Sequence, residues 1–309
     1  MRIVFMGTPE FAVPSLKALI QHEYEIAGVF TQPDRPKGRG NKMIQGPVKT
    51  AAKEAGIPVF QPEKIRKDGV EDLKKLSPDL CVTAAFGQIL SQEILNIPPI
   101  GNINVHASLL PKHRGAAPIA YSIINAEKKT GVTTMFMDAG IDTGDILLQA
   151  ETDIEETETC IELTKRLSEI GADLLIRTIR KLEDGSLIRT AQVEEEMTYD
   201  PMLDKSMGVI DFTADAKRVK GFINGLNPWP CVTVPIGEER IKLLRAVCSE
   251  ESGPAGTIIH SDTKNGLVIA TGSGAVKILE LQAPGGKAMK AADYLRGHRI
   301  EQGTSVKED

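Results

Sequence analysis

Short apolar runs alternate with helical stretches over the first 185 residues, and this alternation restricts the possible folds more than any other feature. We expect strands over residues 2–6, 25–31, 80–85, 100–106 and 132–137. We expect helices over residues 14–21, 48–56, 70–76, 91–95 and 117–126, and a long amphipathic helix over 159–183. Buried strands separated by helices predict an α/β fold with a doubly wound, mostly parallel sheet.

The pattern changes after residue 190. Residues 194–208 are polar and show no clear periodicity, so we divide the chain into a domain at 1–190, a linker at 191–207 and a second domain at 208–309. After a helix at 214–226 and a rigid turn at Asn227-Pro-Trp-Pro230, we expect strands at 232–236, 240–247, 256–259, 266–270 and 275–281. Strands without intervening helices predict a small β-barrel, with the oligonucleotide-binding (OB) type as one candidate.

The composition narrows the class of protein. With 309 residues, 41% of them hydrophobic and 26% charged, the chain is typical of a soluble globular protein. Its net charge of −5 provides no overall basic field that would attract nucleic acid. The N-terminus begins with a strand instead of a signal peptide, and no apolar run has the length of a membrane span. We therefore expect a cytoplasmic protein without a membrane partner.

Two polar residues mark the end of the strand at 100–106. Asn104 and His106 occupy alternate positions, so their side chains share one face of the sheet. Asp142 follows in a glycine-rich loop at 137–145. Open α/β sheets bind ligands beyond the carboxyl ends of their strands, and these three residue types suit proton transfer and oxyanion stabilisation. The pattern predicts an enzyme with Asn104, His106 and Asp142 as its catalytic set.

Two alternatives involve metals. A metal site at His106 would need two more ligands nearby, and only His113 is a candidate. Asp138, Asp142 and Asp145 resemble part of a calcium loop, but the glutamate at its twelfth position is missing. We therefore expect no metal, and we interpret residues 143–145 as a turn that holds Asp142 in place.

A basic loop follows the second expected strand. Arg35, Lys37, Arg39 and Lys42 are opposed only by Asp34. The loop also contains two glycines and two prolines, so we expect no regular structure there. Such a loop is either a solvated insertion or a flexible arm for phosphate contacts.

Several motifs resemble those of a known family. Asn104-x-His106, Ser108-Leu-Leu-Pro-x-x-Arg-Gly115 and Asp142 resemble the folate-dependent formyltransferases. Phe30-Thr-Gln-Pro-Asp-Arg-Pro-x-Gly-Arg-Gly40, Gly115-Ala-Ala-Pro-Ile119 and Asn227-Pro-Trp-Pro230 are similar to the members that act on methionyl-tRNA. The resemblance covers essentially the whole chain. It implies a Rossmann-like formyltransferase domain followed by an OB-type domain that binds tRNA.

The resemblance also implies a reaction. The formyl group of 10-formyltetrahydrofolate would move to the α-amino group of methionyl initiator tRNA, without a metal. Asn104 and a protonated His106 would donate hydrogen bonds to the oxyanion, each contributing about 3 kcal/mol. Asp142 would hold the imidazole in its charged form and help carry a proton from the amine to the departing nitrogen.

Binding residues follow from the same resemblance. The residues that would contact the folate are Ser108, Leu109, Leu110, Pro111, Phe86, Gly87, Ile89 and Leu90. Those that would contact tRNA are Arg35, Lys37, Arg39 and Lys42, with weaker candidates at Lys217, Arg218, Lys220, Lys242 and Arg245. The chain departs from the family at His113, where an aromatic residue is usual.

Other functions explain less of the chain. A glycinamide ribonucleotide formyltransferase would leave the C-terminal third unexplained, and a formyltetrahydrofolate hydrolase would carry a regulatory domain before the catalytic one. A sugar-nucleotide formyltransferase would share the catalytic half but not the arginine-rich loop. A non-catalytic RNA-binding module would leave the set of Asn104, His106 and Asp142 without a purpose. We expect the protein to be a monomer.

Overall fold

A computed structural model describes residues 1–37 and 42–307 of the chain. They form two compact units that alternate along the sequence. Unit 1 consists of Met1–Gly115, Gly131–Thr152 and Thr164–Tyr199, and unit 2 consists of Ala116–Thr130, Asp153–Leu163 and Asp200–Asp309. Two internal segments of the chain therefore pack with its C-terminal part.

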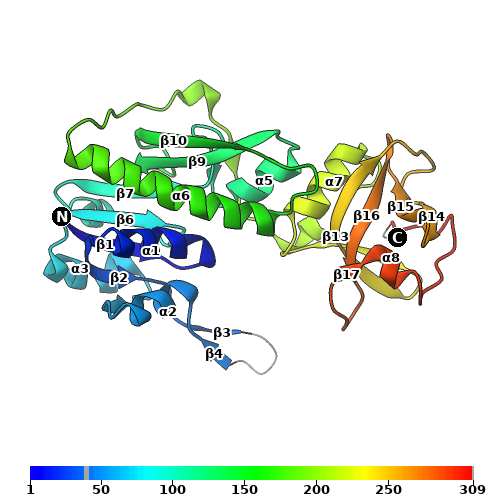
Figure 1. The fold of residues 1–309 in the computed structure, drawn as a ribbon, viewed down its shortest axis with the longest axis horizontal. Coiled ribbons are helices and arrows are strands. Elements are labelled where there is room, and N and C mark those ends of the chain that lie inside the picture. The colour runs from blue at the N-terminus through cyan, green and yellow to red at the C-terminus, as the bar shows by residue number, and fades with distance from the viewer. Residues whose placement is uncertain (38–41, 308–309) are drawn as a thin grey trace. The chain divides into compact units, whose positions relative to one another are not determined.

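A seven-stranded sheet forms the centre of unit 1 (Figure 1). Its order is β10-β9-β7-β6-β1-β2-β5, and all four pairs from β7 to β5 are parallel, whereas β9 is antiparallel to β7. The strands are β1 (Arg2–Gly7), β2 (Glu25–Phe30), β5 (Val59–Phe60), β6 (Leu80–Ala84), β7 (Gly101–His106), β9 (Lys129–Phe136) and β10 (Ile146–Asp153). This arrangement confirms the predicted α/β fold with a mostly parallel sheet.

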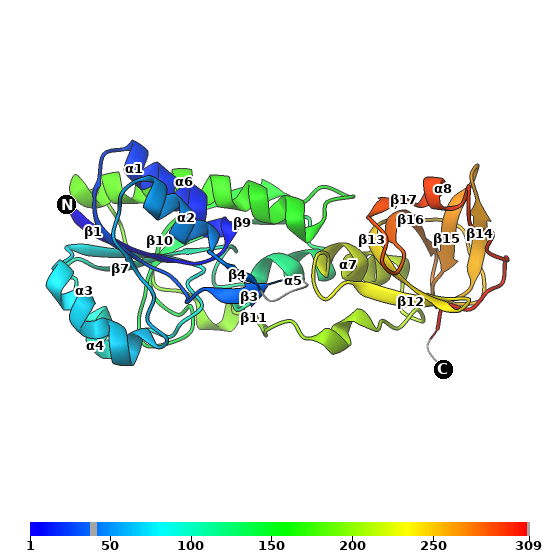
Figure 2. The same ribbon diagram turned by 90° about the horizontal axis from the view of Figure 1, so that it is seen from below.

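Helices cover both faces of this sheet. Figure 2 shows α1 (Val13–Gln21), α2 (Pro47–Glu54) and α6 (Cys160–Glu183) on one side, and α3 (Val70–Leu76) and α4 (Gln92–Leu95) on the other. Val4 and Met6 of β1 pack into a core with residues of α3 and α4, while Ile3 and Phe5 between them are also fully buried. Burial on both faces explains why these strands are continuous apolar runs.

Unit 2 contains a curled antiparallel sheet in the order β12-β13-β16-β15-β14. Its strands are β12 (Val232–Ile236), β13 (Glu239–Ser249), β14 (Ile258–Asp262), β15 (Gly266–Ala270) and β16 (Ala275–Gln282). All five predicted strands are present, although β14 begins two residues later than expected.

Two helices complete the core of unit 2. Helix α5 (Pro118–Ile124) packs against α7 (Ala216–Gly225), and both contribute side chains to the same apolar cluster as the sheet. Gly221 allows this close approach, because a Cβ atom there would lie 2.6 Å from the carbonyl oxygen of Ile124.

Two features of unit 1 differ from the prediction. The expectation that the basic loop has no regular structure is wrong, because β3 (Arg35–Lys37) and β4 (Lys42–Ile44) form a short antiparallel pair. Pro36 is tolerated because this two-stranded ribbon consists only of edge strands. Strand β10 was not predicted, because its alternating buried and exposed residues lack the apolar run of the central strands.

The remaining elements are short. They are η1 (Glu10–Ala12), η2 (Ile65–Gly69), η3 (Glu194–Glu196), η4 (Lys205–Gly208), β8 (Arg114–Gly115) paired with β11 (Tyr199–Asp200), β17 (Met289–Lys290) and α8 (Ala291–Tyr294). Within residues 1–37 and 42–307, none of the helices combines the length and apolar character needed to cross a membrane.

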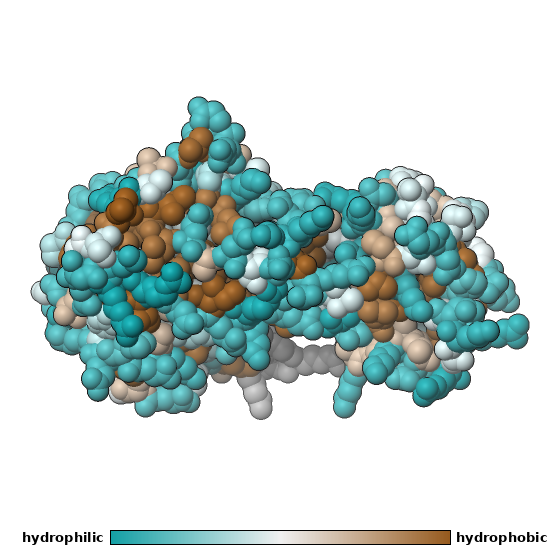
Figure 3. Space-filling view, turned by 45° about the horizontal axis from the view of Figure 1, so that its top comes forward, coloured by the Kyte–Doolittle hydropathy of each residue, from teal (hydrophilic) through white to brown (hydrophobic). Residues whose placement is uncertain are grey.

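Figure 3 shows apolar side chains gathered on one face of unit 1.

Candidate active site

The predicted catalytic strand lies next to β6 in the middle of the sheet. Asn104 of β7 pairs in parallel register with Thr83 of β6, so the carboxyl ends of the two strands share one edge. Asn104 and His106 are both buried at this edge. The structure thus brings the two residues to the end of a central parallel strand, as the sequence predicts.

Asp142 reaches the His106 ring from the loop between β9 and β10. The distance from His106 Nδ1 to Asp142 Oδ1 is 3.6 Å, and both side chains are largely buried. On the other side of the ring, Nε2 lies 2.9 Å from the carbonyl oxygen of His113. A carbonyl oxygen can only accept, so Nε2 must carry a hydrogen. Nδ1 on the opposite side of the ring faces the Asp142 carboxylate.

The loop that carries Asp142 is held by its own side chains and backbone. Asp138 Oδ1 accepts hydrogen bonds from the Gly140 amide (3.0 Å) and the Thr143 hydroxyl (2.6 Å). At Gly144, a Cβ atom would lie 1.8 Å from the carbonyl oxygen of Phe136, so this position requires glycine. Asp138 therefore supports a turn, and no cluster among the described residues has the side chains to hold a metal ion.

Asp142 itself has a left-handed backbone with φ of 55°. Its Oδ2 accepts a hydrogen bond of 2.9 Å from the Gly115 amide. Its carbonyl oxygen accepts one of 2.8 Å from Nε2 of Gln192. The residue is therefore fixed from the side chain and from the backbone.

The residues expected to contact folate fall into two groups. Phe86, Leu90, Ser108 and Leu110 are buried, and the Ser108 hydroxyl donates to the carbonyl oxygen of Lys112 (2.7 Å). Ile89 is 73% exposed, Gly87 is also exposed, and Leu109 and Pro111 are half-buried. The second group is thus accessible at the surface, whereas the first is part of the interior.

The basic hairpin is anchored at its base. Lys49 Nζ of α2 donates to Asp34 Oδ2 (2.5 Å) and to Gln61 Oε1 (2.6 Å), and Gln61 Nε2 donates to Asp34 Oδ1 (3.0 Å). The hydrogen bond from Lys49 lowers the pKa of Asp34. Nε2 of Gln61 also donates to the backbone carbonyl oxygen of Gln32 (2.9 Å). The side-chain amide of Gln32 in turn donates to the carbonyl oxygen of Gly87 (2.8 Å). These contacts connect the base of the hairpin to the loop after β6.

Of the predicted tRNA contacts, Arg35 is exposed on β3. Lys37 ends β3 and Lys42 begins β4, and the two are backbone register partners in the ribbon. Arg39 lies outside the described residues.

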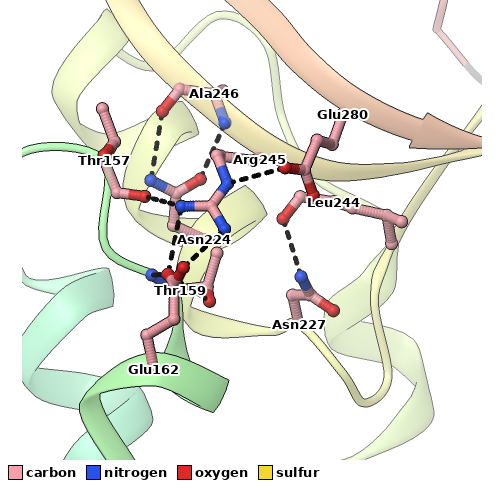
Figure 4. Close-up of polar contacts among 9 residues, drawn as sticks. All are labelled: Thr157, Thr159, Glu162, Asn224, Asn227, Leu244, Arg245, Ala246 and Glu280. Carbon is pink, nitrogen blue, oxygen red and sulfur yellow. Dashed lines mark hydrogen bonds and ion pairs between the residues drawn. The ribbon is translucent and has the colours of Figure 1, made fainter. Parts of the chain in front are cut away.

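The weaker candidates in unit 2 have different surroundings. Arg245 donates to both carboxylate oxygens of Glu162 (3.0 and 2.7 Å) and to the Thr157 carbonyl (2.9 Å), and it also pairs with Glu280 (Figure 4). Its guanidinium is engaged within unit 2, which argues against the suggested contact with a tRNA phosphate. Nearby, the Asn224 amide bonds to both backbone groups of Ala246 and attaches α7 to β13.

Of the four other cations in this set, two have partners within unit 2 and two are exposed. Arg218 lies over the Phe222 ring and donates to the carbonyl oxygen of Ile124 (3.2 Å). Lys220 donates to the carbonyl oxygen of Glu156 (3.2 Å). Lys217 and Lys242 have exposed side chains. These last two keep the surroundings that a phosphate contact needs.

Arg114 and Gln192 were missed as functional candidates. Arg114 is buried and forms a two-pronged ion pair with Glu194, with distances of 3.0 and 2.9 Å. Its Nε donates to Gln192 (3.0 Å). Arg114 belongs to the Arg-Gly pair of the family motif, which was a usable signal. Gln192 lies in the segment expected to be a linker, where contacts from side chain to backbone leave no periodicity.

Comparisons with known proteins show the family of the chain. Residues 1–179 match the family model "Formyl transferase", and residues 202–299 match "Formyl transferase, C-terminal domain". The chain is 48% identical to the methionyl-tRNA formyltransferase of Acetivibrio thermocellus, with 98% of each protein covered. It is 47% identical to that of Caldanaerobacter subterraneus, with 99% of this chain and 100% of the relative covered.

Solved structures share the fold at lower identity. A sugar 3N-formyl transferase, WlaRD, determined with dTDP and 5-N-formyl-THF, superposes with a TM-score of 0.66 at 20% identity, covering 92% of this chain and 97% of that one. HypX from Aquifex aeolicus in complex with tetrahydrofolic acid gives a TM-score of 0.65 at 17% identity, covering 98% of this chain and 50% of that one. Given the family matches and the two relatives, the chain belongs to the methionyl-tRNA formyltransferases of the formyl transferase family.

Proposed function

We propose that this protein transfers the formyl group of 10-formyltetrahydrofolate to the α-amino group of methionyl initiator tRNA. One observation carries the proposal. Asn104 and His106 lie at the end of β7 with Asp142 beside the ring, in a chain 48% identical to a methionyl-tRNA formyltransferase. The product would be N-formylmethionyl-tRNA, which serves translation initiation, so we also propose a cytoplasmic location.

The folate would act as a co-substrate that brings the activated carbon. Exposed and half-buried residues near the strand ends suit it, because Ile89, Leu109 and Pro111 offer apolar surface while the backbone at Gly87 can approach a polar ring edge. We propose that these residues contact the folate. In this arrangement the contact residues would be supported by four buried residues, Phe86, Leu90, Ser108 and Leu110.

Three side chains would perform the chemistry. The neutral amine attacks the formyl carbon, a new N–C bond forms, and the carbonyl oxygen becomes an oxyanion. The Asn104 amide would donate to this oxygen, and His106 would add a second donor once Nε2 exchanges the His113 carbonyl for it. Asp142 would stabilise the charged ring, and the proton lost by the amine would reach the folate nitrogen as the old C–N bond breaks.

The tRNA would be bound by the hairpin and by the C-terminal domain. Arg35, Lys37, Arg39 and Lys42 would contact phosphates, which lie at high density along a nucleic acid. We assign transfer to residues 1–190 and tRNA binding to residues 208–309, and we propose that the curled sheet of unit 2 is of the OB type. We further propose that the protein acts as a monomer.

A direct assay tests the proposal. Transfer of a labelled formyl group from 10-formyltetrahydrofolate is measured with methionyl initiator tRNA, a dTDP-linked amino sugar and glycinamide ribonucleotide as acceptors. We expect turnover with the tRNA alone. Turnover with the sugar nucleotide instead would be consistent with the assigned catalytic residues, but it would contradict the proposal that tRNA is the acceptor.

The variant His106→Ala separates chemistry from binding. We expect turnover to fall by about 10²- to 10⁴-fold while the tRNA dissociation constant stays within about 2-fold. Equal activity of the variant and the wild type would contradict the role of His106.

A further inference from the structure

Gln192 lies between the two loops of the candidate active site and bonds to both. Its Oε1 accepts a hydrogen bond of 3.0 Å from Arg114 Nε. Its Nε2 donates to the carbonyl oxygens of Asp142 and Gly144, each at 2.8 Å. The amide therefore has a partner for its oxygen and for both of its N–H groups.

These partners determine which way the amide points. Arg114 Nε can only donate, and the two carbonyl oxygens can only accept. With the amide turned over, its NH₂ group would face the guanidinium and its oxygen would face two carbonyls. Only one orientation satisfies all three contacts, so Gln192 acts as a rigid bracket.

One side of the bracket is itself firmly held. Arg114 is buried, and two parallel hydrogen bonds of 3.0 and 2.9 Å join its guanidinium to the Glu194 carboxylate. The pKa of Glu194 is lowered by this guanidinium. The Arg114 amide also donates to the carbonyl oxygen of Thr198 (2.9 Å). These contacts fix the position of Arg114 Nε independently of Gln192.

The other side of the bracket is a strained turn. Asp142 has φ of 55°, a left-handed conformation that residues with a Cβ atom rarely adopt. Gln192 bonds to the carbonyl of this residue and to that of Gly144, two residues later. It thus holds both ends of the peptide segment that gives the Asp142 side chain its direction.

We propose that Gln192 is a positioning residue for Asp142, an inference that rests on the proposed function. By fixing the left-handed backbone, it holds the carboxylate at the Gly115 amide and beside the His106 ring. Gln192 is then part of the catalytic apparatus of unit 1, although it lies in the segment at 191–207 whose sequence resembles a linker.

Two substitutions test the bracket. Gln192→Met keeps the length of the side chain and removes all three hydrogen bonds. Gln192→Glu keeps an acceptor for Arg114 and removes the two donors, so it decides the question if the methionine variant does not fold. The control is Glu195→Gln in the same segment, which changes an exposed carboxylate and leaves the three hydrogen bonds of Gln192 intact.

A positioning role predicts a specific kinetic pattern. In both Gln192 variants, kcat for formyl transfer to methionyl initiator tRNA should fall by about 10- to 100-fold. The KM values for tRNA and folate should stay within about 2-fold, because neither binding surface changes. Glu195→Gln should keep the wild-type kcat.

Three outcomes would overturn the inference. Unchanged kcat in both Gln192 variants would do so, and so would an equal loss in Glu195→Gln. Increased KM values with unchanged kcat would show a structural role in substrate binding instead. The wild-type rate is measured first. No turnover by the wild type would overturn the proposed function together with this inference, whereas normal turnover with unaffected variants would overturn the inference alone.

Discussion

The backbone amide of Gly115 donates a hydrogen bond of 2.9 Å to the carboxylate of Asp142. This contact joins the loop after β7 to the loop after β9. It uses Oδ2, while Oδ1 lies 3.6 Å from Nδ1 of His106. The negative charge is thus held in place by a neutral donor and directed at the imidazole.

Replacing Asp142 by asparagine should separate its charge from its shape. The Asn oxygen can still accept from the Gly115 amide, so we expect the melting temperature to stay close to that of the wild type. The charge beside His106 is lost, and kcat should fall by about 10²- to 10⁴-fold. Steady-state kinetics and thermal denaturation measure both quantities, and a kcat within 3-fold of the wild type would exclude the assigned role.

Arg35→Ala should weaken tRNA binding without affecting the folate. Arg35 is an exposed cation of the hairpin, and each phosphate contact contributes about one unit to the slope of log affinity against log salt concentration. We expect a higher KM for tRNA, an unchanged KM for folate and a slope reduced by about 1.

The matched control for Arg35 is Arg66→Ala, which removes an exposed arginine of η2 in the same unit. If both variants change the salt slope equally, the effect comes from net charge and not from the hairpin.

Lys49→Met should loosen the base of the hairpin. Lys49 bonds to Asp34 and Gln61, and its removal leaves a largely buried carboxylate without its cation. We expect a loss of about 1–3 kcal/mol in the free energy of unfolding and a higher KM for tRNA. Denaturant unfolding and kinetics measure the two effects.

Lys53→Met is the control for Lys49, because Lys53 is exposed on the same helix. A normal KM for tRNA in Lys49→Met would mean that the hairpin does not depend on this anchor.

The sequence pattern predicts the central strands and the catalytic residues of β7, but it does not predict the edge strands of unit 1. The strands β1, β2, β6 and β7 were predicted because most of their residues are buried, which gives the short runs that are typical of central strands. Asn104 and His106 were found because they interrupt such a run at its end. Edge strand β10 was missed because its buried and exposed residues alternate, and the β3–β4 ribbon was missed because its described side chains are exposed and the glycines and prolines of the basic loop are typical of irregular loops.

The supporting contacts could not be predicted from the sequence. Gln192 acts through backbone carbonyls 48 and 50 residues away, and a carbonyl group carries no sequence information. The role of Lys49 is equally hidden in the sequence, because its partner Gln61 is an ordinary polar residue before a short helix. Only the three-dimensional arrangement shows which polar side chains determine the geometry of the site.

Glu162→Gln should remove a contribution to the free energy of unfolding that depends on pH. Hydrogen bonds from Arg245 hold the pKa of Glu162 at about 2, below its ordinary value of 4.5. A lowered pKa stabilises the folded state above pH 4.5, and this contribution disappears as the pH falls from about 4.5 through about 2. Because the side chain is 47% exposed, we expect a contribution of only about 1 kcal/mol at pH 7.

The measurement is the free energy of unfolding of the wild type and the variant between pH 7 and pH 2. The difference between them should shrink toward zero at low pH. Glu169→Gln, on an exposed position of the same helix, serves as the control. A difference that does not change with pH would show that the Glu162 charge is not involved.

The packing of α5 on α7 has a consequence for how the protein is made. The carbonyl oxygen of Ile124 meets Gly221, a residue synthesised 97 positions later, and Ile124 belongs to the same apolar cluster as strands β12 to β16. While the ribosome is still producing the C-terminal third, α5 has no partner for its buried face. The core of unit 2 can close only when nearly the whole chain has emerged, so an N-terminal fragment ending before α7 would display this apolar helix to chaperones and proteases.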